Sequence, residues 1–261
     1  MGIVNLTADS FSGDGVGMDV ARAIAHAEMQ RDAGADMLDL GAESTRPGAQ
    51  PVAAADELAR LLPVLKVVCE WGLPISVDTH KPEVMRAAID AGAAMINDIA
   101  ALRSPGALEV AAASDVGVCL MHMQGEPRTM QTQPVYGDVV SEVRAFLEGR
   151  MAACVAAGIA VERLTVDPGF GFGKTVEHNY ALLRELAVFG SLGVPVLAGL
   201  SRKSMLGVVT GQPNGGARMP ASVAAAALAV ERGASIVRVH DVAATKDALA
   251  VWAAIEGRMQ Q

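Results

Sequence analysis

Three polar residues stand where short apolar runs end: Asp78, Asn97 and Asp167. A carboxylate in apolar surroundings is costly unless hydrogen-bond donors meet it. These side chains could therefore act as a general acid and base, hold a metal ion, or accept hydrogen bonds from a flat amino-heterocycle. For Asp78, a cap of the helix that follows it is a further alternative.

A second group is cationic and consists of Arg46, Arg202, Lys203, Arg238 and His240. The chain is acidic, with a net charge of −8, so clustered donors imply an anionic ligand, most simply a phosphate or diphosphate. Asn5 could bind a Mg²⁺ that bridges diphosphate oxygens. For Lys203 the alternative is a Schiff base, but its place beyond the apolar run favours a positioning charge. For Arg46 the alternative is a surface salt bridge.

A third feature is the stretch 164–174, in which an apolar run ends in Asp167 and alternating glycines pass two phenylalanines. A phosphate-binding loop would need glycine where Pro168 stands, and a dinucleotide fingerprint would need it at Lys174. The pattern favours a ligand-facing edge, with a glycine-rich turn after a buried strand as the alternative.

Two loops and one methionine complete the candidate site. Residues 5–15 and 41–48 form polar, glycine-bearing connections of a kind that commonly closes over substrates, although exposed connectors look the same. Met121 could line a flat apolar pocket or fill the core.

The elements that must position these residues alternate between short apolar strands and longer helices. We expect strands near 2–6, 36–40, 74–78, 94–97, 117–121, 164–167, 194–198 and 235–239. We expect helices near 20–33, 53–71, 82–91, 104–114, 139–157, 176–189, 205–230 and 242–256.

About eight such units on roughly 250 residues predict an α/β fold, the (β/α)₈ barrel, as a single domain over 1–261, with an open doubly wound sheet as the alternative. In a barrel, chemistry lies at the carboxyl ends of the strands. The polar residues there are Asn5, Asp39, Glu43, Asp78, Asn97, Asp98, His122, Asp167, Ser201, Arg202, Lys203, Arg238, His240 and Asp241. We therefore expect one shared active site.

Composition excludes several classes of protein. The acidic charge and a pI near 5.1 argue against a nucleic-acid partner. The apolar run around 223–230 is too short to span a bilayer, so no membrane partner is expected. Three isolated cysteines and the lack of a signal peptide predict a reducing, cytoplasmic location.

The motifs together resemble one family, the dihydropteroate synthases, which are pterin-binding barrel enzymes of bacterial folate synthesis. The resemblance runs nearly end to end and rests on residues 1–7, 9–12, 41–47 (GAESTRP), 76–79, 96–99, 120–123, 167–174 (DPGFGFGK), 201–204 and 238–241. It implies condensation of 6-hydroxymethyl-7,8-dihydropterin diphosphate with 4-aminobenzoate, in which diphosphate departs before the amine attacks. It also implies Mg²⁺, competition by sulfonamides and a homodimer.

The resemblance implies roles for individual residues. The pterin would be held by Asp78, Asn97, Asp167 and Lys203, with Arg238 stacked on it and Met121 alongside. Asn5 would bind Mg²⁺ and diphosphate, helped by Arg46, Arg238 and His240. The aminobenzoate would be framed by Phe11, Thr45, Arg46, Pro47, Phe172 and Ser204. The catalytic candidates are Asp9, Asp78, Asp167, Lys203, Arg238 and His240.

Departures from the family pattern are Ala8, where proline is usual, and His80, where serine is usual. Two other functions are considered. A pterin-dependent methyltransferase would share the barrel but should lack the Thr45–Pro47 and 201–204 motifs. A non-catalytic paralogue would keep the fold without the activity.

Overall fold

The computed structural model describes residues 1–7, 19–44, 48–126 and 129–257 of the chain. Its strands are β1 (Gly2–Asn5), β2 (Leu38–Gly41), β3 (Ile75–Asp78), β4 (Met95–Asp98), β5 (Gly117–Met121), β6 (Leu164–Asp167), β7 (Leu197–Ala198) and β8 (Ile236–Val237). The first six pair in parallel and in chain order, and β7 pairs with β8.

Two parallel bridges close these strands into a barrel. Gly2 bridges to Val239, and Val166 bridges to Val196. The amide of Ile3 donates to the carbonyl of Val239 at 2.9 Å, and that of Val166 donates to Pro195 at 3.0 Å. The predicted (β/α)₈ barrel is confirmed, and the open sheet is wrong.

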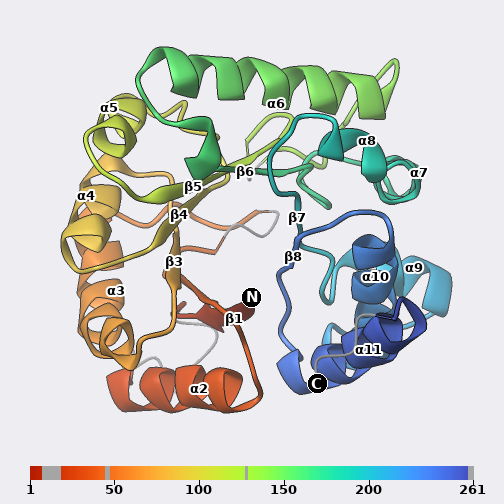
Figure 1. The fold of residues 1–261 in the computed structure, drawn as a ribbon, viewed down its shortest axis with the longest axis horizontal. Helices are drawn as coiled ribbons and strands as arrows, with labels where there is room; N and C mark the ends of the chain where they lie inside the picture. The colour runs from red at the N-terminus through yellow and green to blue at the C-terminus, as the bar shows by residue number, and fades with distance from the viewer. Residues whose placement is uncertain (8–18, 45–47, 127–128, 258–261) are drawn as a thin grey trace.

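The helices surround the strands as an outer ring (Figure 1). They are α2 (Val20–Asp32), α3 (Ala54–Val68), α4 (Pro82–Asp90), α5 (Ala107–Ala112), α6 (Val139–Ala156), α7 (Val176–Arg184), α8 (Ala187–Gly190), α9 (Ser204–Thr210), α10 (Met219–Glu231) and α11 (Val242–Ile255). Short 3₁₀ turns lie at η1 (Cys69–Trp71), η2 (Val161–Arg163) and η3 (Gly216–Arg218).

Two predicted helices are split. The one expected at 176–189 divides into α7 and α8, and the one expected at 205–230 divides into α9, η3 and α10. Gly211 adopts a φ of 69° as the C-cap of α9, a left-handed conformation that ends a helix. The predicted strands 194–198 and 235–239 shorten to two residues each.

The barrel has two interior layers of different character. Towards the amino ends of the strands, Met1, Met95, Cys119 and Leu197 form a small apolar cluster. Near the carboxyl ends, the buried side chains of the strands include the polar Asp39, Asn97 and Asp167. Since parallel strands end at one edge, this places the predicted polar residues together. In the described part of the chain, no helix is long and apolar enough to cross a membrane.

Candidate active site

An arginine bound by two carboxylates lies in the barrel interior near the carboxyl ends of the strands. Arg238, just beyond β8, donates from Nε to Asp39 Oδ2 at 2.5 Å and from Nη2 to Asp78 Oδ2 at 3.0 Å. Asn97 Nδ2 lies 3.4 Å from the same Asp39 oxygen. Asp39 is fully buried, whereas the Asp78 side chain is 13% exposed. The N-cap of α4 is Lys81, without a side-chain cap bond, so the alternative that Asp78 caps this helix is wrong.

Burial and neighbouring charges change the protonation of Asp78. Burial raises its pKa to about 7, since the lowering effect of Arg238 is opposed by Asp39 and other carboxylates. A carboxyl that is part protonated near neutrality can both donate and accept a hydrogen bond. Such a group suits a heterocycle that presents adjacent donors and acceptors.

A second carboxylate, Asp167, faces a second cation. Asp167 ends β6, is buried, and accepts from the amide of Gly169 at 2.7 Å. Burial raises its pKa, while Lys203 is among the charges that oppose the rise. Burial lowers the pKa of Lys203 to about 8, although Asp167 and Asp78 act to raise it. The predicted group of Asp78, Asn97, Asp167, Lys203 and Arg238 is thus brought together.

The glycine-rich loop after β6 packs directly on the segment that follows β5. Gly169 has a φ of 70°, and a Cβ there would lie 1.9 Å from the carbonyl oxygen of His122. Lys203 donates to the carbonyl of Phe170, and its Nζ lies 4.4 Å from the centre of the Phe172 ring. Met121 is buried in a cluster that Phe172 contacts. The loop therefore lies beside Lys203 and packs on the end of β5, and its role as a ligand-facing edge stays a prediction.

The predicted cations Arg202 and His240 differ in the groups that their side chains contact. Arg202 binds Asp241 with Nε and Nη2, at 3.0 and 2.6 Å. This pairing was not foreseen, and it makes Arg202 a poor anion donor. His240 Nδ1 lies 2.9 Å from the Ser201 hydroxyl. Ser204 begins α9 and is exposed.

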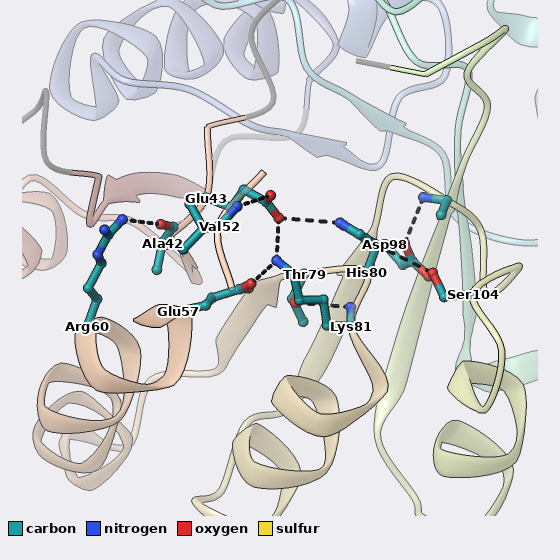
Figure 2. Close-up of polar contacts among 11 residues, drawn as sticks. Ala42, Glu43, Val52, Glu57, Arg60, Thr79, His80, Lys81, Asp98 and Ser104 are labelled. Atoms are coloured by element: carbon teal, nitrogen blue, oxygen red, sulfur yellow. Dashed lines mark hydrogen bonds and ion pairs between the residues drawn. The ribbon is translucent and has the colours of Figure 1, made fainter. Parts of the chain in front are cut away.

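A charged network holds the first turn after β3 against the segment after β2 (Figure 2). Lys81 Nζ lies 2.6 Å from Glu43 Oε2 and also contacts Glu57, which is 1% exposed. His80 Nε2 lies 3.3 Å from the same Glu43 oxygen. The other Glu43 oxygen accepts from the amide of Val52 at 2.9 Å.

The protonation states in this network favour an ion cluster. Burial would raise the pKa of Glu43, but hydrogen bonds from His80, Lys81 and Val52 outweigh it and hold that pKa at about 2. The hydrogen bond to Glu43 raises the pKa of His80. Glu43, just after β2, thus binds Val52, just before α3, through one oxygen, and His80 and Lys81, just after β3, through the other.

Five predicted site residues lie outside the described residues: Asp9, Phe11, Thr45, Arg46 and Pro47. Conversely, the sequence placed Asp39 at a strand end without giving it a role, and it did not assign Lys81 to the site. An acid inside the apolar run Leu38–Gly41 was the available signal for Asp39, because an unpaired carboxylate there is costly. Lys81 carried no comparable signal, since a lysine before a proline is ordinary at a helix start.

The residues present were compared with the needs of a Mg²⁺ ion. No group of three or more His, Cys, Asp or Glu side chains in the described ranges could hold a metal. Asn5 ends β1, half-buried, and no hydrogen bond of its side chain is found within those ranges. One amide oxygen fits an ion that keeps most of its waters and takes its other ligands from a substrate diphosphate.

Comparison with known proteins places this geometry in context. The family described as pterin binding enzyme matches residues 1–240. Dihydropteroate synthase of Neisseria meningitidis serogroup C is 54% identical over 259 residues, covering 98% of this chain and 92% of that protein.

Two solved structures are similar throughout. Xanthomonas albilineans dihydropteroate synthase with 4-aminobenzoic acid has a TM-score of 0.93 and 53% identity, covering 98% of this chain and 92% of its own. Yersinia pestis dihydropteroate synthase with a sulfonamide drug complex has a TM-score of 0.94 and 44% identity, covering 98% and 94%.

Proposed function

The chain belongs to the dihydropteroate synthases of the pterin-binding enzyme family, and from this premise we propose how its residues perform the reaction. It is a transferase that joins 6-hydroxymethyl-7,8-dihydropterin diphosphate to 4-aminobenzoate, giving 7,8-dihydropteroate and diphosphate. The relatives named above favour this activity over a methyltransferase.

The observation that carries the proposal is the cluster of Asp78, Asn97 and Asp167 around Lys203 and Arg238. Its acceptors match the amine and ring N–H groups of a pterin, and Asp78, with a pKa of about 7, can match either sense of hydrogen bond. Arg238 is already bound by Asp39 and Asp78. Its flat guanidinium is therefore held in place to stack on the ring.

Diphosphate departs first and leaves a cationic pterin. Asp78 and Asp167 stabilise this cation because preorganised carboxylates act strongly at a water-poor site. His240 and Arg46 stabilise the departing anion, and Asn5 would hold a Mg²⁺ ion. That ion would supply charge neutralisation for the diphosphate. The aniline nitrogen attacks without prior deprotonation, so no strong base is required.

The second substrate, 4-aminobenzoate, binds nearer the mouth of the barrel than the pterin does. Phe172 and Ser204 are its contacts among the described residues, and Phe11, Thr45, Arg46 and Pro47 are predicted contacts beyond them. Sulfonamides compete for this position, as the drug complex of the Yersinia pestis relative supports. Asp9 stays a predicted catalytic residue.

A homodimer and a cytoplasmic location are part of the same proposal. Large exposed apolar side chains lie on the late helices: Val208, Val209, Leu228, Val251 and Ile255. A second copy of the chain would cover them. Light scattering after gel filtration tests this, and a monomer at micromolar concentration would contradict it.

The cytoplasmic location rests on Cys69, Cys119 and Cys154, which form no disulfides.

The activity is tested by diphosphate release. We expect release only when pterin diphosphate, 4-aminobenzoate and Mg²⁺ are all present. A folded protein that releases nothing with all three would be a non-catalytic paralogue, and the proposal would fail.

A further inference from the structure

Lys174 is a buried ammonium whose contacts are almost all to backbone. It is 3% exposed. Its Nζ lies 2.8 Å from the carbonyl oxygen of Gly169, 3.0 Å from that of Phe172 and 3.3 Å from that of His122. It also lies 3.0 Å from His122 Nδ1. No carboxylate in the described ranges forms a salt bridge with it, so the contacts serve the backbone rather than charge pairing.

The loop that these contacts hold belongs to no helix or strand, and its one internal backbone bond among the described residues runs from the amide of Phe172 to the carbonyl of Gly169 at 3.1 Å. Its five consecutive carbonyls each accept from a side chain: Gly169 and Phe172 from Lys174, Phe170 from Lys203, Gly171 from Gln131 and Gly173 from Tyr136. A loop without a backbone ladder takes its conformation from such donors. Lys174, whose side chain is buried, donates to two of these five carbonyls.

The ammonium lies in the seam between this loop and the segment after β5. A Cβ at Gly169 would overlap the His122 carbonyl, and one at Gly173 would lie 2.4 Å from the carbonyl of Gln124. Lys174 bonds to His122 on one side of the seam and to the loop on the other. The loop in turn carries Phe172 and receives the hydrogen bond from Lys203.

We propose that Lys174 is a positioning residue for the synthase reaction, because its ammonium fixes the 168–174 loop on His122 and so sets the places of Phe172 and Lys203 towards the two substrates. This inference rests on the proposed function but concerns a residue that touches neither substrate. It also requires His122 to present an unprotonated Nδ1, since an ammonium can only donate.

The surroundings of Lys174 agree with this requirement. The charged or titratable groups that face it are His122, Asp167 and Lys203, with the Tyr136 hydroxyl near the end of the loop. Burial, followed by Lys174 itself, lowers the pKa of His122 to about 3, so its ring is neutral. Burial lowers the pKa of Lys174 to about 7, against the opposing effect of Asp167.

Kinetics of Lys174→Met provide the first test. Methionine keeps an unbranched apolar side chain of similar length, one heavy atom shorter, but cannot donate, so the loop should shift. We expect kcat/KM for 4-aminobenzoate to fall on the order of 100-fold, because small misplacements of reacting groups have effects of that size. The matched control is Arg163→Met. Arg163 also donates to buried carbonyls, those of Val116 and Ala111, but at the opposite end of β6.

Both variants should lose stability, but only K174M should lose kcat/KM when rates are corrected for the folded fraction. Wild-type kinetics in K174M, or an equal loss in R163M, would overturn the proposal. Absence of turnover in the wild-type protein would instead refute the proposed function.

Nitrogen NMR of His122 in the wild-type protein is the second test, and it needs neither a folded variant nor turnover. We expect Nδ1 to be unprotonated and Nε2 protonated at pH 6, where Lys174, with a pKa of about 7, is an ammonium. A protonated Nδ1 at pH 6 would overturn the proposal, because it could not accept from Lys174.

Discussion

Replacement of Arg238 by methionine tests whether its two carboxylates depend on it. The change removes the Nε bond to Asp39 at 2.5 Å and the Nη2 bond to Asp78 at 3.0 Å. Asp78 is 13% exposed and can regain water. Asp39 is fully buried and cannot, and its Oδ1 already has no partner in the described part of the chain.

The loss in unfolding free energy should therefore come mainly from Asp39. Leaving one partner of a buried ion pair uncompensated costs about 3–5 kcal/mol. Asp39→Asn removes the charge and keeps the shape. The double variant R238M/D39N should then recover about 2 kcal/mol or more of the loss, as coupled neighbours do.

Urea unfolding at pH 8 measures these free energies. The matched control is Arg144→Met, because Arg144 pairs with Glu148 at 3.1 Å on the surface of α6. An exposed pair of this kind contributes about 0.3–0.5 kcal/mol. A loss below about 1 kcal/mol in R238M, or additive effects of R238M and D39N, would refute the reasoning.

Three further predictions concern single sites. Since burial raises the pKa of Asp78 to about 7, the folded state binds a proton that the unfolded state has released above roughly pH 4. The unfolding free energy of the wild-type protein should therefore fall as pH rises from roughly 4 to about 7, and Asp78→Asn should make this fall less steep. If the urea midpoint of the variant depended on pH as steeply as that of the wild type, the prediction would be wrong. Lys81→Met leaves the buried Glu57 without its cation and Glu43 with only His80, and it should cost about 3–5 kcal/mol of unfolding free energy; a loss near that of R144M would contradict the buried network. Gly169→Ala and Gly72→Ala both act at a φ of 70°, which alone costs about 1–2 kcal/mol. Only Gly169 would clash with His122, so thermal unfolding should show a much larger loss there, and equal losses would contradict the close packing.

Much of the fold was predictable because strand ends carry clear chemistry. The bounds of β5 and β6 were predicted correctly, since apolar runs there stop at His122 and Pro168. The predicted bounds failed where tertiary structure decides them. Nothing local shows that the apolar run 194–198 pairs over only two residues, and the helix predicted across 205–230 overlooked the left-handed Gly211.

The site was predictable in its residue types but not in its pairings. Asp39 and Arg238 are separated by 199 positions, and no periodicity states which acid meets which cation. Arg202 was counted among the anion donors, yet Asp241 binds it. No role was predicted for Lys174, because its four acceptors are backbone or ring atoms that a sequence does not place.

We infer that Asp78, Asn97, Asp167 and Lys203 hold the pterin. A crystal structure of this protein with 7,8-dihydropteroate bound tests it most directly. We expect the pterin ring to lie among these four side chains, with Arg238 stacked on it and the aminobenzoate portion against Phe172. A pterin ring bound elsewhere, with Asp78 and Asp167 making no contact to it, would contradict the account.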